Sequence, residues 1–523
     1  MSGTVSRREV VIGAAAAASL SSLAWSADKT SLATTVHGKV RGTVQNGIHT
    51  FKGIRYGADT KARRFMPPLA PAPWKRPLDA TQYGPSSPQS GKETDPISED
   101  CLFLNVWTPG LRDGAKRPVM FYIHGGAYSH GSGSSPLYDG TRLCKRGDVV
   151  VVTVNHRLNS FGYLYLARLG GAQFADSGNA GMLDLVLALQ WVRDNIGEFG
   201  GDPDRVMVFG QSGGGAKIAT LMGMPVARSL FHRAVTMSGQ QVTASGPLNA
   251  TLRARAFLDA LKRPVSDVAS LPMEQIIEAM SATDPVIGKG SLYFGPVLDE
   301  RTLQHHPFYP DAPAISKHIP MIIGNTHDET RLLIGGADQQ AFSLSWEQLP
   351  EKLAAAMRVD ITPETVVAAY RQMYPDYTAS DVFFSATTAA RSWRGAIIEV
   401  EARAAQGAPA YAYELDWKTP IEGGKWGAPH TLDIPLAFDN IAAAGSLAGT
   451  SADAQRVADQ LSETFIAFAR TGNPNNEAIP AWEPYQLPRR RTMLINVESK
   501  LADDPRGPER ELFAKVPWIQ QGT

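Results

Sequence analysis

Short apolar runs alternate with helix-like segments along most of this chain. The runs have the length of buried β-strands, and they are Val119–Ile123, Val149–Val154, Val206–Phe209, Ala234–Met237, Met321–Ile323 and Tyr411–Leu415. The clearest helix-like segment is Met182–Ile196, where apolar side chains recur every three or four positions. This alternation predicts an α/β fold with a large, mostly parallel central sheet and helices on both faces.

Other regions depart from this alternation. Residues 34–55 have the pattern of an antiparallel ribbon, with a turn at Asn46-Gly47. Asp202-Pro203-Asp204 predicts a break before the next strand. Residues 244–290 and 333–408 are helix-like, and we interpret them as excursions over the active edge of the sheet rather than as separate domains.

The first 26 residues predict an export signal. Arg7-Arg8 precedes an alanine-rich apolar stretch, and Ala24-Trp25-Ser26 places small residues where a signal peptidase reads them. The arginine pair is typical of twin-arginine signals. A membrane anchor is the alternative, but the stretch is shorter than the roughly 18 apolar residues that spanning requires. We therefore expect a signal peptide over 1–26 and a single domain over 27–523, periplasmic or secreted from a bacterium, without stable membrane insertion.

Composition and charge narrow the function classes. The chain has 523 residues, 43% of them apolar, which is ample for a large core. It carries 51 basic and 51 acidic residues, so its formal charge indicates neither nucleic acid nor an anionic membrane as a partner. Cys101 and Cys144, the only cysteines, are too few for a disulfide framework or a zinc site. We expect two isolated thiols, and one bridge between them in an oxidising compartment is the alternative. His305-His306 lacks further ligands at metal-site spacing, so we expect neither metal nor cofactor. Neither the composition nor the net charge indicates an oligomeric state.

The stretch from Val206 to Gly215 carries the strongest chemical motif. An apolar run leads into Gly210-Gln211-Ser212-Gly213-Gly214, and residues 216–222 are helix-like. This is G-x-S-x-G in the strand, turn and helix context that exposes a nucleophilic serine. Bulky residues at the outer glycines would clash in such a turn. A structural or phosphate-binding turn is the alternative, but the rest of the chain favours Ser212 as a nucleophile.

A nucleophilic serine needs a base to take its proton and an acid to orient that base. In hydrolases with this elbow the chain order is serine, acid, histidine. His430 is the last histidine of the chain and lies in a Gly/Pro loop, a usual place for catalytic side chains. Asp328 and Glu329 follow the apolar run at Met321–Ile323, and either carboxylate could orient His430.

The oxyanion of the tetrahedral intermediate needs fixed backbone N–H donors. The residue after the serine, Gly213, is expected to supply one. The run ending at Ile123 is followed by His124-Gly125-Gly126-Ala127-Tyr128, a turn whose small residues let amides approach a substrate. We expect this turn to supply the others.

With these residues in place, the chain resembles the type-B carboxylesterases, the esterase and lipase branch that includes p-nitrobenzyl esterases and cholinesterases. The resemblance covers nearly the whole chain after the export signal. Its motifs are Phe51–Tyr56, Arg64–Pro68, Ser98–Val106, Asn155–Leu158 and Phe199–Pro203. It implies an α/β-hydrolase fold and cleavage of small-molecule carboxylic esters through an acyl-enzyme intermediate, without a cofactor.

The resemblance also implies roles for individual residues. The family's acid is the glutamate of an Asp-Glu pair, which matches Glu329. A serine after the next strand supports that acid, which matches Ser238. The family's acyl-pocket aromatics match Tyr293-Phe294, for which core packing is the alternative. Its oxyanion amides match Gly126, Ala127 and Gly213.

Four positions depart from the family pattern. Ala127 replaces the third glycine of the oxyanion turn, and Gly213 replaces the usual alanine. Gln211 stands where a glutamate usually precedes the serine, so a negative charge that favours cationic substrates is missing. Cys101 has no upstream cysteine, so the disulfide loop of the cholinesterase gorge cannot form. We therefore expect neutral hydrophobic esters rather than choline esters.

Two other functions are compatible with the same fold. An amidase or an acyltransferase would use the same three residues, and the sequence does not separate either from an esterase. A non-catalytic binding protein, as among neuroligin-like relatives, would lack the nucleophile or its partners, whereas this chain keeps all three. A carboxylic ester hydrolase is the main hypothesis.

Overall fold

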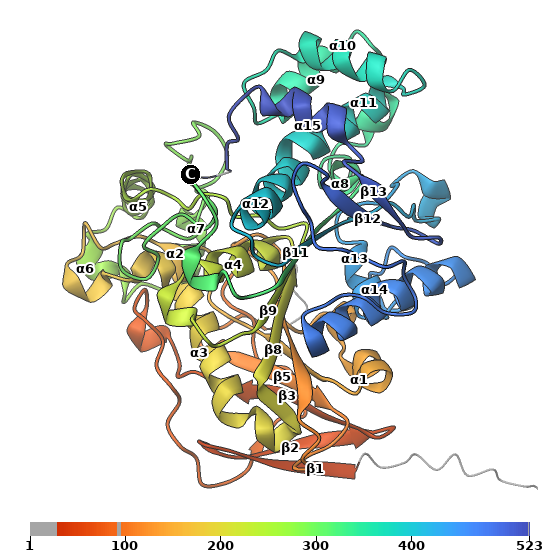
Figure 1. Cartoon of the computed structure of the whole chain (residues 1–523). Coiled ribbons are helices and arrows are strands. Elements are labelled where there is room, and N and C mark those ends of the chain that lie inside the picture. Colours follow the sequence, from red (N-terminus) through yellow and green to blue (C-terminus); the bar gives the residue numbers. More distant parts are fainter. Residues whose placement is uncertain (1–28, 92–95, 521, 523) are drawn as a thin grey trace, which may run out of the picture.

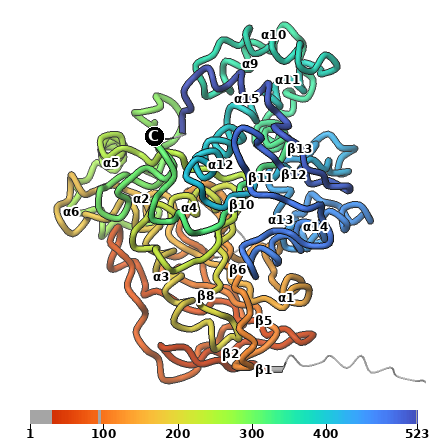
Figure 2. The backbone as a smooth tube through the Cα atoms, viewed as in Figure 1, coloured from red at the N-terminus to blue at the C-terminus, as the bar shows by residue number. Residues whose placement is uncertain are grey.

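The computed structural model describes residues 29–91, 96–520 and 522 (Figure 1, Figure 2). Its centre is a sheet of 13 strands in the order β1-β2-β3-β5-β7-β6-β8-β9-β10-β11-β12-β13, with β4 paired to β2. The strands are β1 (Lys29–Thr35), β2 (Gly38–Gln45), β3 (Ile48–Arg55), β4 (Leu78–Asp79), β5 (Phe103–Thr108), β6 (Arg117–Ile123), β7 (Val150–Val154), β8 (Gly201–Gln211), β9 (Arg233–Met237), β10 (Met321–Thr326), β11 (Ala410–Leu415), β12 (Arg491–Ile495) and β13 (Lys500–Asp503).

The centre of the sheet is parallel and its two ends are antiparallel. Strands β7, β6, β8, β9, β10, β11 and β12 run in the same direction. The first strands form an antiparallel ribbon in which Gln45 pairs with Ile48 across the turn at Asn46-Gly47. The predicted mostly parallel sheet and the predicted ribbon are therefore confirmed.

Helices cover both faces of this sheet (Figure 1). They are α1 (Thr141–Gly147), α2 (Asn159–Tyr163), α3 (Ala180–Asn195), α4 (Gly213–Met222), α5 (Pro247–Leu261), α6 (Val265–Val268), α7 (Met273–Ala279), α8 (Glu329–Leu333), α9 (Leu349–Ala356), α10 (Pro363–Met373), α11 (Ala379–Thr388), α12 (Arg394–Ala405), α13 (Asp433–Ala437), α14 (Ala452–Thr471) and α15 (Gly507–Ala514). Helices α3 and α4 lie on one face, and α1, α13 and α14 lie on the other (Figure 1).

Successive side chains of each central strand enter opposite cores. In β6, Val119, Phe121 and Ile123 pack in the core that includes α3 and α4. Met120 and Tyr122 pack in the core that includes α13 and α14. Since neighbouring side chains of a strand point to opposite faces, a continuous apolar run is what a strand buried on both faces requires.

The two helix-like excursions of the sequence lie beside the sheet as α5–α7 and α8–α12. Helices α9, α10, α11 and the C-terminal α15 share a separate small core. Between α11 and α12 the chain makes a π-helical turn, Ala389–Trp393. Within the described residues, no helix has both the length and the apolar character needed to cross a bilayer.

The predicted break at Asp202-Pro203-Asp204 is wrong. Strand β8 already begins at Gly201, which pairs with Arg117 before the register shifts to Val119 and Val206. The intervening residues form an irregularity in the ladder, and such bulges tolerate proline because the ladder is already interrupted there.

The two cysteines are isolated, as expected. Both are buried and free. Cys101 packs in the core on the α3 side of the sheet, and Cys144 packs in the core on the α14 side. The sheet between them excludes a bridge.

Candidate active site

Ser212 occupies the turn between β8 and α4 with a strained backbone. Its φ is 55° and its ψ is −124°, a combination that L-residues rarely adopt. The turn is pinned on both sides, because Ser212 N–H donates to Met237 O (2.7 Å) and Ala216 N–H donates to Ser212 O (3.0 Å). Ser212 itself is half-buried whereas both of its neighbours are buried, so the turn presents its side chain outward.

The glycines of the motif are required by the close approach of β6. A Cβ added to Gly214 would lie 1.9 Å from Ile123 O, and one added to Gly210 would lie 2.6 Å from the same oxygen. Both positions therefore exclude any side chain, which agrees with the steric reason for the G-x-S-x-G pattern.

His430 and Glu329 are joined directly. Glu329 Oε2 accepts a hydrogen bond from His430 Nδ1. The other oxygen, Oε1, accepts from the N–H of Thr326 (3.1 Å) and from Nδ2 of Asn325 (3.2 Å). Glu329 has no exposed surface and His430 is 6% exposed. The carboxylate is thus held by three donors at a fixed position behind the imidazole.

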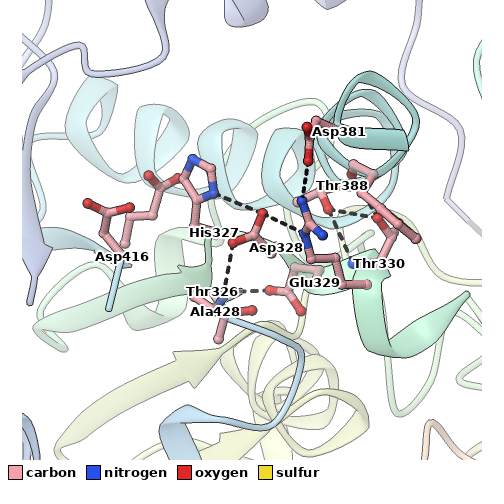
Figure 3. A network of polar contacts seen from close by, with 12 residues as sticks. Thr326, His327, Asp328, Glu329, Thr330, Asp381, Thr388, Asp416 and Ala428 are labelled. Atoms are coloured by element: carbon pink, nitrogen blue, oxygen red, sulfur yellow. Dashed lines mark hydrogen bonds and ion pairs between the residues drawn. The ribbon is translucent and has the colours of Figure 1, made fainter. Parts of the chain in front are cut away.

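Asp328 faces another set of partners (Figure 3). Its carboxylate accepts from Ala428 N–H (2.9 Å) and lies 3.3 Å from His327 Nδ1. Burial raises the pKa of Asp328, but the neighbouring His327, the N–H of Ala428 and the charge of Arg331 outweigh burial and hold that pKa well below its usual range. Figure 3 shows the two carboxylates directed to different partners, Glu329 toward Thr326 and Asp328 toward His327. Of the two candidates, only Glu329 contacts His430 in the part of the chain that the structure describes.

Gln211 lies against the imidazole. Its Nε2 is 3.2 Å from Nε2 and 3.4 Å from Nδ1 of His430, and the residue is 1% exposed. No hydrogen bond joins Ser212 Oγ to His430 within the described residues, although both line one cavity. Such contacts are often long in the absence of substrate and shorten in the reacting complex.

The predicted oxyanion turn lies beside the serine. Gly126 and Ala127 both have left-handed backbones, with φ of 84° and 52°. Over residues 29–91 and 96–520, the N–H groups of Gly126, Ala127 and Gly213 have no hydrogen-bond acceptor, so all three are available to a ligand. Lys217 Nζ donates to Ala127 O (2.6 Å) from α4, and burial lowers its pKa to about 7.

Two of the departures from the family pattern, Ala127 and Gly213, are sterically linked. A Cβ added to Gly213 would lie 2.0 Å from Ala127 O and 2.5 Å from Ala127 Cα. The alanine that usually follows the serine therefore has no room here. Ala127 and Gly213 exchange the two residue types that the family usually has at these positions.

Ser238 contacts a hydrogen-bond partner of Glu329 rather than Glu329 itself. Its Oγ accepts from Thr326 N–H (3.4 Å), the same group that donates to Glu329. Among the described residues, no hydrogen bond joins Ser238 to Glu329. Ser238 is therefore linked to the Glu329 carboxylate only through Thr326, whereas the resemblance implies that this serine supports the carboxylate.

A cavity of about 430 Å³ brings most of the predicted site together. Its walls include Ser212, His430, Gln211, Ser238, Tyr293 and the three residues predicted for the oxyanion hole, Gly126, Ala127 and Gly213. A larger cavity of about 1350 Å³ shares Ala127, Tyr128 and Tyr293 with it. Phe294 lines the larger cavity but not the Ser212 cavity, and it packs edge-to-face on Phe257, with ring centroids 6.1 Å apart. Tyr293 is therefore at the site, whereas Phe294 belongs mainly to the core.

Residues 28–512 match the model of the carboxylesterase family. The chain belongs to this family. Para-nitrobenzyl esterase from Bacillus subtilis (strain 168) is 35% identical to this carboxylesterase over 499 residues, with 92% of this chain and 98% of the relative covered. Fumonisin B1 esterase from Sphingopyxis macrogoltabida is 30% identical, over 86% and 84% of the two chains.

Solved structures agree with this assignment. The fold is similar to that of a carboxylesterase from Geobacillus stearothermophilus, with a TM-score of 0.81, 36% identity and coverage of 92% of this chain and 99% of the other. A solved PNB esterase gives a TM-score of 0.77 at 34% identity, with the same coverage. The expected α/β-hydrolase fold is confirmed, and this carboxylesterase is a carboxylic ester hydrolase.

Several residues at the carboxylesterase site carry no motif in the sequence. Arg358 and Arg391 come from the region 333–408, and Trp518, Ile519 and Gln520 come from the C-terminal segment, yet all five line the cavity at Ser212. Of these five, only Arg358 and Arg391 could be anticipated from the sequence, because we interpret region 333–408 as an excursion over the active edge of the sheet. Within the described residues, no cluster of three His, Cys, Asp or Glu side chains could hold a metal ion, and His306 Nδ1 accepts from Ala244 N–H (3.1 Å).

Proposed function

We propose that Ser212, His430 and Glu329 form the catalytic triad of this carboxylesterase. The observation that carries the proposal is the hydrogen bond from His430 Nδ1 to the buried Glu329, beside a serine on a strained elbow. Because Glu329 occupies Nδ1, the imidazole keeps Nε2 as the nitrogen that accepts the serine proton.

The reaction then proceeds by acyl transfer. Ser212 Oγ bonds to the ester carbonyl carbon while its proton moves to His430 Nε2, and the carbonyl oxygen becomes an oxyanion. The N–H groups of Gly126, Ala127 and Gly213 donate to that oxyanion. The C–O bond to the alcohol breaks, and the departing alcohol takes the proton from His430. Water then attacks the carbonyl carbon of the acyl-enzyme while one of its protons moves to His430. The bond to Ser212 Oγ breaks, Oγ takes the proton back, and the carboxylic acid leaves.

The experiment is hydrolysis of p-nitrophenyl esters across acyl lengths, with matched amides beside them. We expect turnover of the esters, with acyl length reporting the size of the pocket. A fluorophosphonate probe should label the wild type at one site and should leave Ser212→Ala unlabelled. Faster turnover of the matched amides would favour an amidase, and labelling of Ser212→Ala would contradict the proposal.

We also propose export. Arg7-Arg8 and Ala24-Trp25-Ser26 support a twin-arginine signal over residues 1–26 and a periplasmic or secreted mature enzyme. These residues lie outside the described part of the structure, so the proposal rests on the sequence pattern.

A further inference from the structure

A buried lysine contacts the turn that carries two of the three proposed oxyanion donors. Lys217 lies in α4, one helical turn beyond the start of that helix at Gly213, and has no exposed surface. Its Nζ donates to Ala127 O (2.6 Å) and lies 5.0 Å from the centroid of the Tyr128 ring, a distance at which a cation is attracted to the ring. Both contacts are with the turn that follows β6, so a cation inside the protein is directed at the oxyanion turn.

The position of this ammonium group is unfavourable for stability. Burial lowers the pKa of Lys217 to about 7, which means that the surroundings disfavour the charged form. An apolar side chain of similar length would avoid that cost. Groups with strongly shifted pKa values are concentrated at functional sites, so the contact with Ala127 calls for a functional explanation.

The Ala127 carbonyl approaches α4 at two positions. A Cβ added to Gly213 would lie 2.0 Å from Ala127 O, and Lys217 Nζ donates to the same oxygen. Positions four apart lie on one face of a helix, and side chains lean toward the N-terminus of the helix. Lys217 therefore reaches back toward Gly213, where the missing side chain leaves room for the carbonyl.

Every carbonyl group from Gly125 to Ala127 has a hydrogen-bond donor. The pairs are His124 Nδ1 with Gly125 O (2.9 Å), the N–H groups of Ser129 and His130 with Gly126 O (3.1 Å each), and Lys217 Nζ with Ala127 O. In a trans peptide the N–H points away from the C=O of the same unit. The N–H groups of Gly126 and Ala127 are therefore directed away from these donors, and both residues line the Ser212 cavity.

Ala127 needs restraint on both sides because its φ is 52°. A left-handed backbone is unfavourable for alanine and persists only where the surroundings fix it. The peptide unit before Ala127 is held through Gly126 O, and the unit after it is held through Lys217. Without Lys217 the alanine could relax toward ordinary backbone angles, and its N–H would turn with it.

We propose that Lys217 is a positioning residue that keeps the N–H of Ala127 directed at the oxyanion. Lys217 acts through the turn and does not itself touch the ester. The inference rests on the proposed function, because it concerns the donors of the Ser212 reaction. The departures at Ala127 and Gly213 then have one explanation, since a left-handed alanine places its carbonyl against a glycine and is held there by the lysine.

The first test is Lys217→Met, which removes the ammonium group at nearly constant length. With p-nitrophenyl pentanoate we expect kcat to fall by about tenfold or more, since a missing oxyanion donor costs on the order of 10²–10³ in rate. KM should stay within about twofold, because the donors act on the transition state rather than on the bound ester. Met222→Leu, a volume-conserving change at a buried position of the same helix, should leave both constants unchanged.

Two ketones separate the oxyanion from general binding. With 1,1,1-trifluorohexan-2-one, which carries the acyl chain of the pentanoate, Ser212 Oγ bonds to the carbonyl carbon, the proton moves to His430 and the carbonyl oxygen becomes an oxyanion. Hexan-2-one has the same chain and binds without this addition. We expect Lys217→Met to weaken inhibition by the trifluoroketone about as much as it lowers kcat/KM, and to leave inhibition by hexan-2-one unchanged.

Stability distinguishes positioning from core packing. Lys217→Met should melt at or above the melting temperature of the wild type, because the buried ammonium is lost. A lower melting temperature together with an equal loss on both ketones would assign Lys217 to the core and overturn the inference. Should Lys217→Met not fold, Lys217→Gln keeps a neutral donor and should show a smaller loss on the trifluoroketone alone, whereas an equal loss on both ketones overturns the inference.

The remaining outcomes separate the inference from the function on which it rests. A Lys217→Met enzyme that keeps the kcat of the wild type overturns the inference while the triad stands. A wild type that does not cleave p-nitrophenyl pentanoate or any other ester, or a Ser212→Ala variant that cleaves it at the wild-type rate, overturns the proposed function itself.

Discussion

Glu329 contacts His430 although the two residues are 101 positions apart in the sequence. Glu329 follows β10, and His430 lies in the segment after β11, the neighbouring parallel strand. The carboxyl ends of parallel strands meet at one edge of a sheet, so these segments converge where β8 also delivers Ser212. Asp328 precedes Glu329 directly, but its carboxylate is directed to His327 and Ala428.

This relationship predicts which carboxylate matters for catalysis. Ser212→Ala or His430→Ala should each lower kcat by on the order of 10⁴–10⁶, and the double variant should be little worse than either, because the residues act as a unit. Glu329→Gln should be severe, whereas Asp328→Asn should be mild. Steady-state kinetics on one p-nitrophenyl ester measures all five. Losses that multiply in the double variant, or a reversed ranking of the carboxylates, would contradict the assignment.

The ion pair between His327 and Asp328 predicts that the free energy of unfolding depends on pH. Burial lowers the pKa of His327, but the adjacent carboxylate of Asp328 outweighs burial and raises that pKa to about 9. Because the folded pKa exceeds the ordinary value of about 6.5, the stabilisation is complete below pH ~6.5 and is lost as the pH rises through about 9. At the acid end it declines as Asp328, whose pKa is lowered, becomes protonated.

The measurement is the melting temperature of wild type and His327→Gln across pH. The variant should melt lower near pH 6, and the difference should shrink as the pH approaches and passes about 9. Exposed His318 offers the matched control, since His318→Gln should track the wild type at every pH. A difference between wild type and His327→Gln that is constant with pH would show that the ion pair is not its source.

The contact between Ala127 and Gly213 predicts a rescue. Gly213→Ala restores the residue that the family usually has, yet its Cβ would displace the Ala127 backbone. We expect a loss in kcat of about tenfold or more, since one misaligned oxyanion donor costs on the order of 10²–10³ in rate. Adding Ala127→Gly should recover part of the loss, because glycine can adopt other backbone angles there. Single and double variants that behave additively would refute the steric link.

Gln211 predicts a change in charge selectivity. Gln211→Glu places a carboxylate where an amide now touches His430, so cationic esters should gain relative to neutral ones. We expect the ratio of kcat/KM for butyrylcholine to that for 3,3-dimethylbutyl butyrate to rise by about tenfold at low salt. The absolute rates should change less, since the carboxylate also stabilises the imidazolium. A wild type that already prefers butyrylcholine would contradict the interpretation of this position.

If the protein is exported through a twin-arginine signal, its mature form should lack residues 1–26. Protein purified from its native host should begin near residue 27, in the periplasm or medium. Arg7→Lys combined with Arg8→Lys should hold the protein in the cytoplasm with unchanged activity per active site, as twin-arginine recognition requires the pair. Active-site titration with a fluorophosphonate provides that normalisation. Soluble cytoplasmic protein that retains residues 1–26 in the native host would argue against export.

Part of this site is determined by local sequence. The run Val206–Phe209 is apolar because β8 is buried on both faces, and Gly210 and Gly214 are glycine because β6 leaves no space for a Cβ. Such short-range constraints leave a pattern in consecutive residues, so the elbow, the flanking helix and the α/β architecture could be predicted. The order serine, acid, histidine then singled out His430.

Tertiary structure alone decided the rest. Which of Asp328 and Glu329 meets His430 depends on side-chain direction at the end of β10, and the local residues left both open until the family resemblance favoured Glu329. The bulge at Asp202–Arg205 depends on the register of β6 against β8. Arg358 and Arg391 line the same cavity as Ser212 although they come from the excursion α8–α12, and no motif marks them. Contacts between segments so far apart in the chain leave no periodicity in either segment, so the lining of the cavity becomes apparent only when the chain is folded.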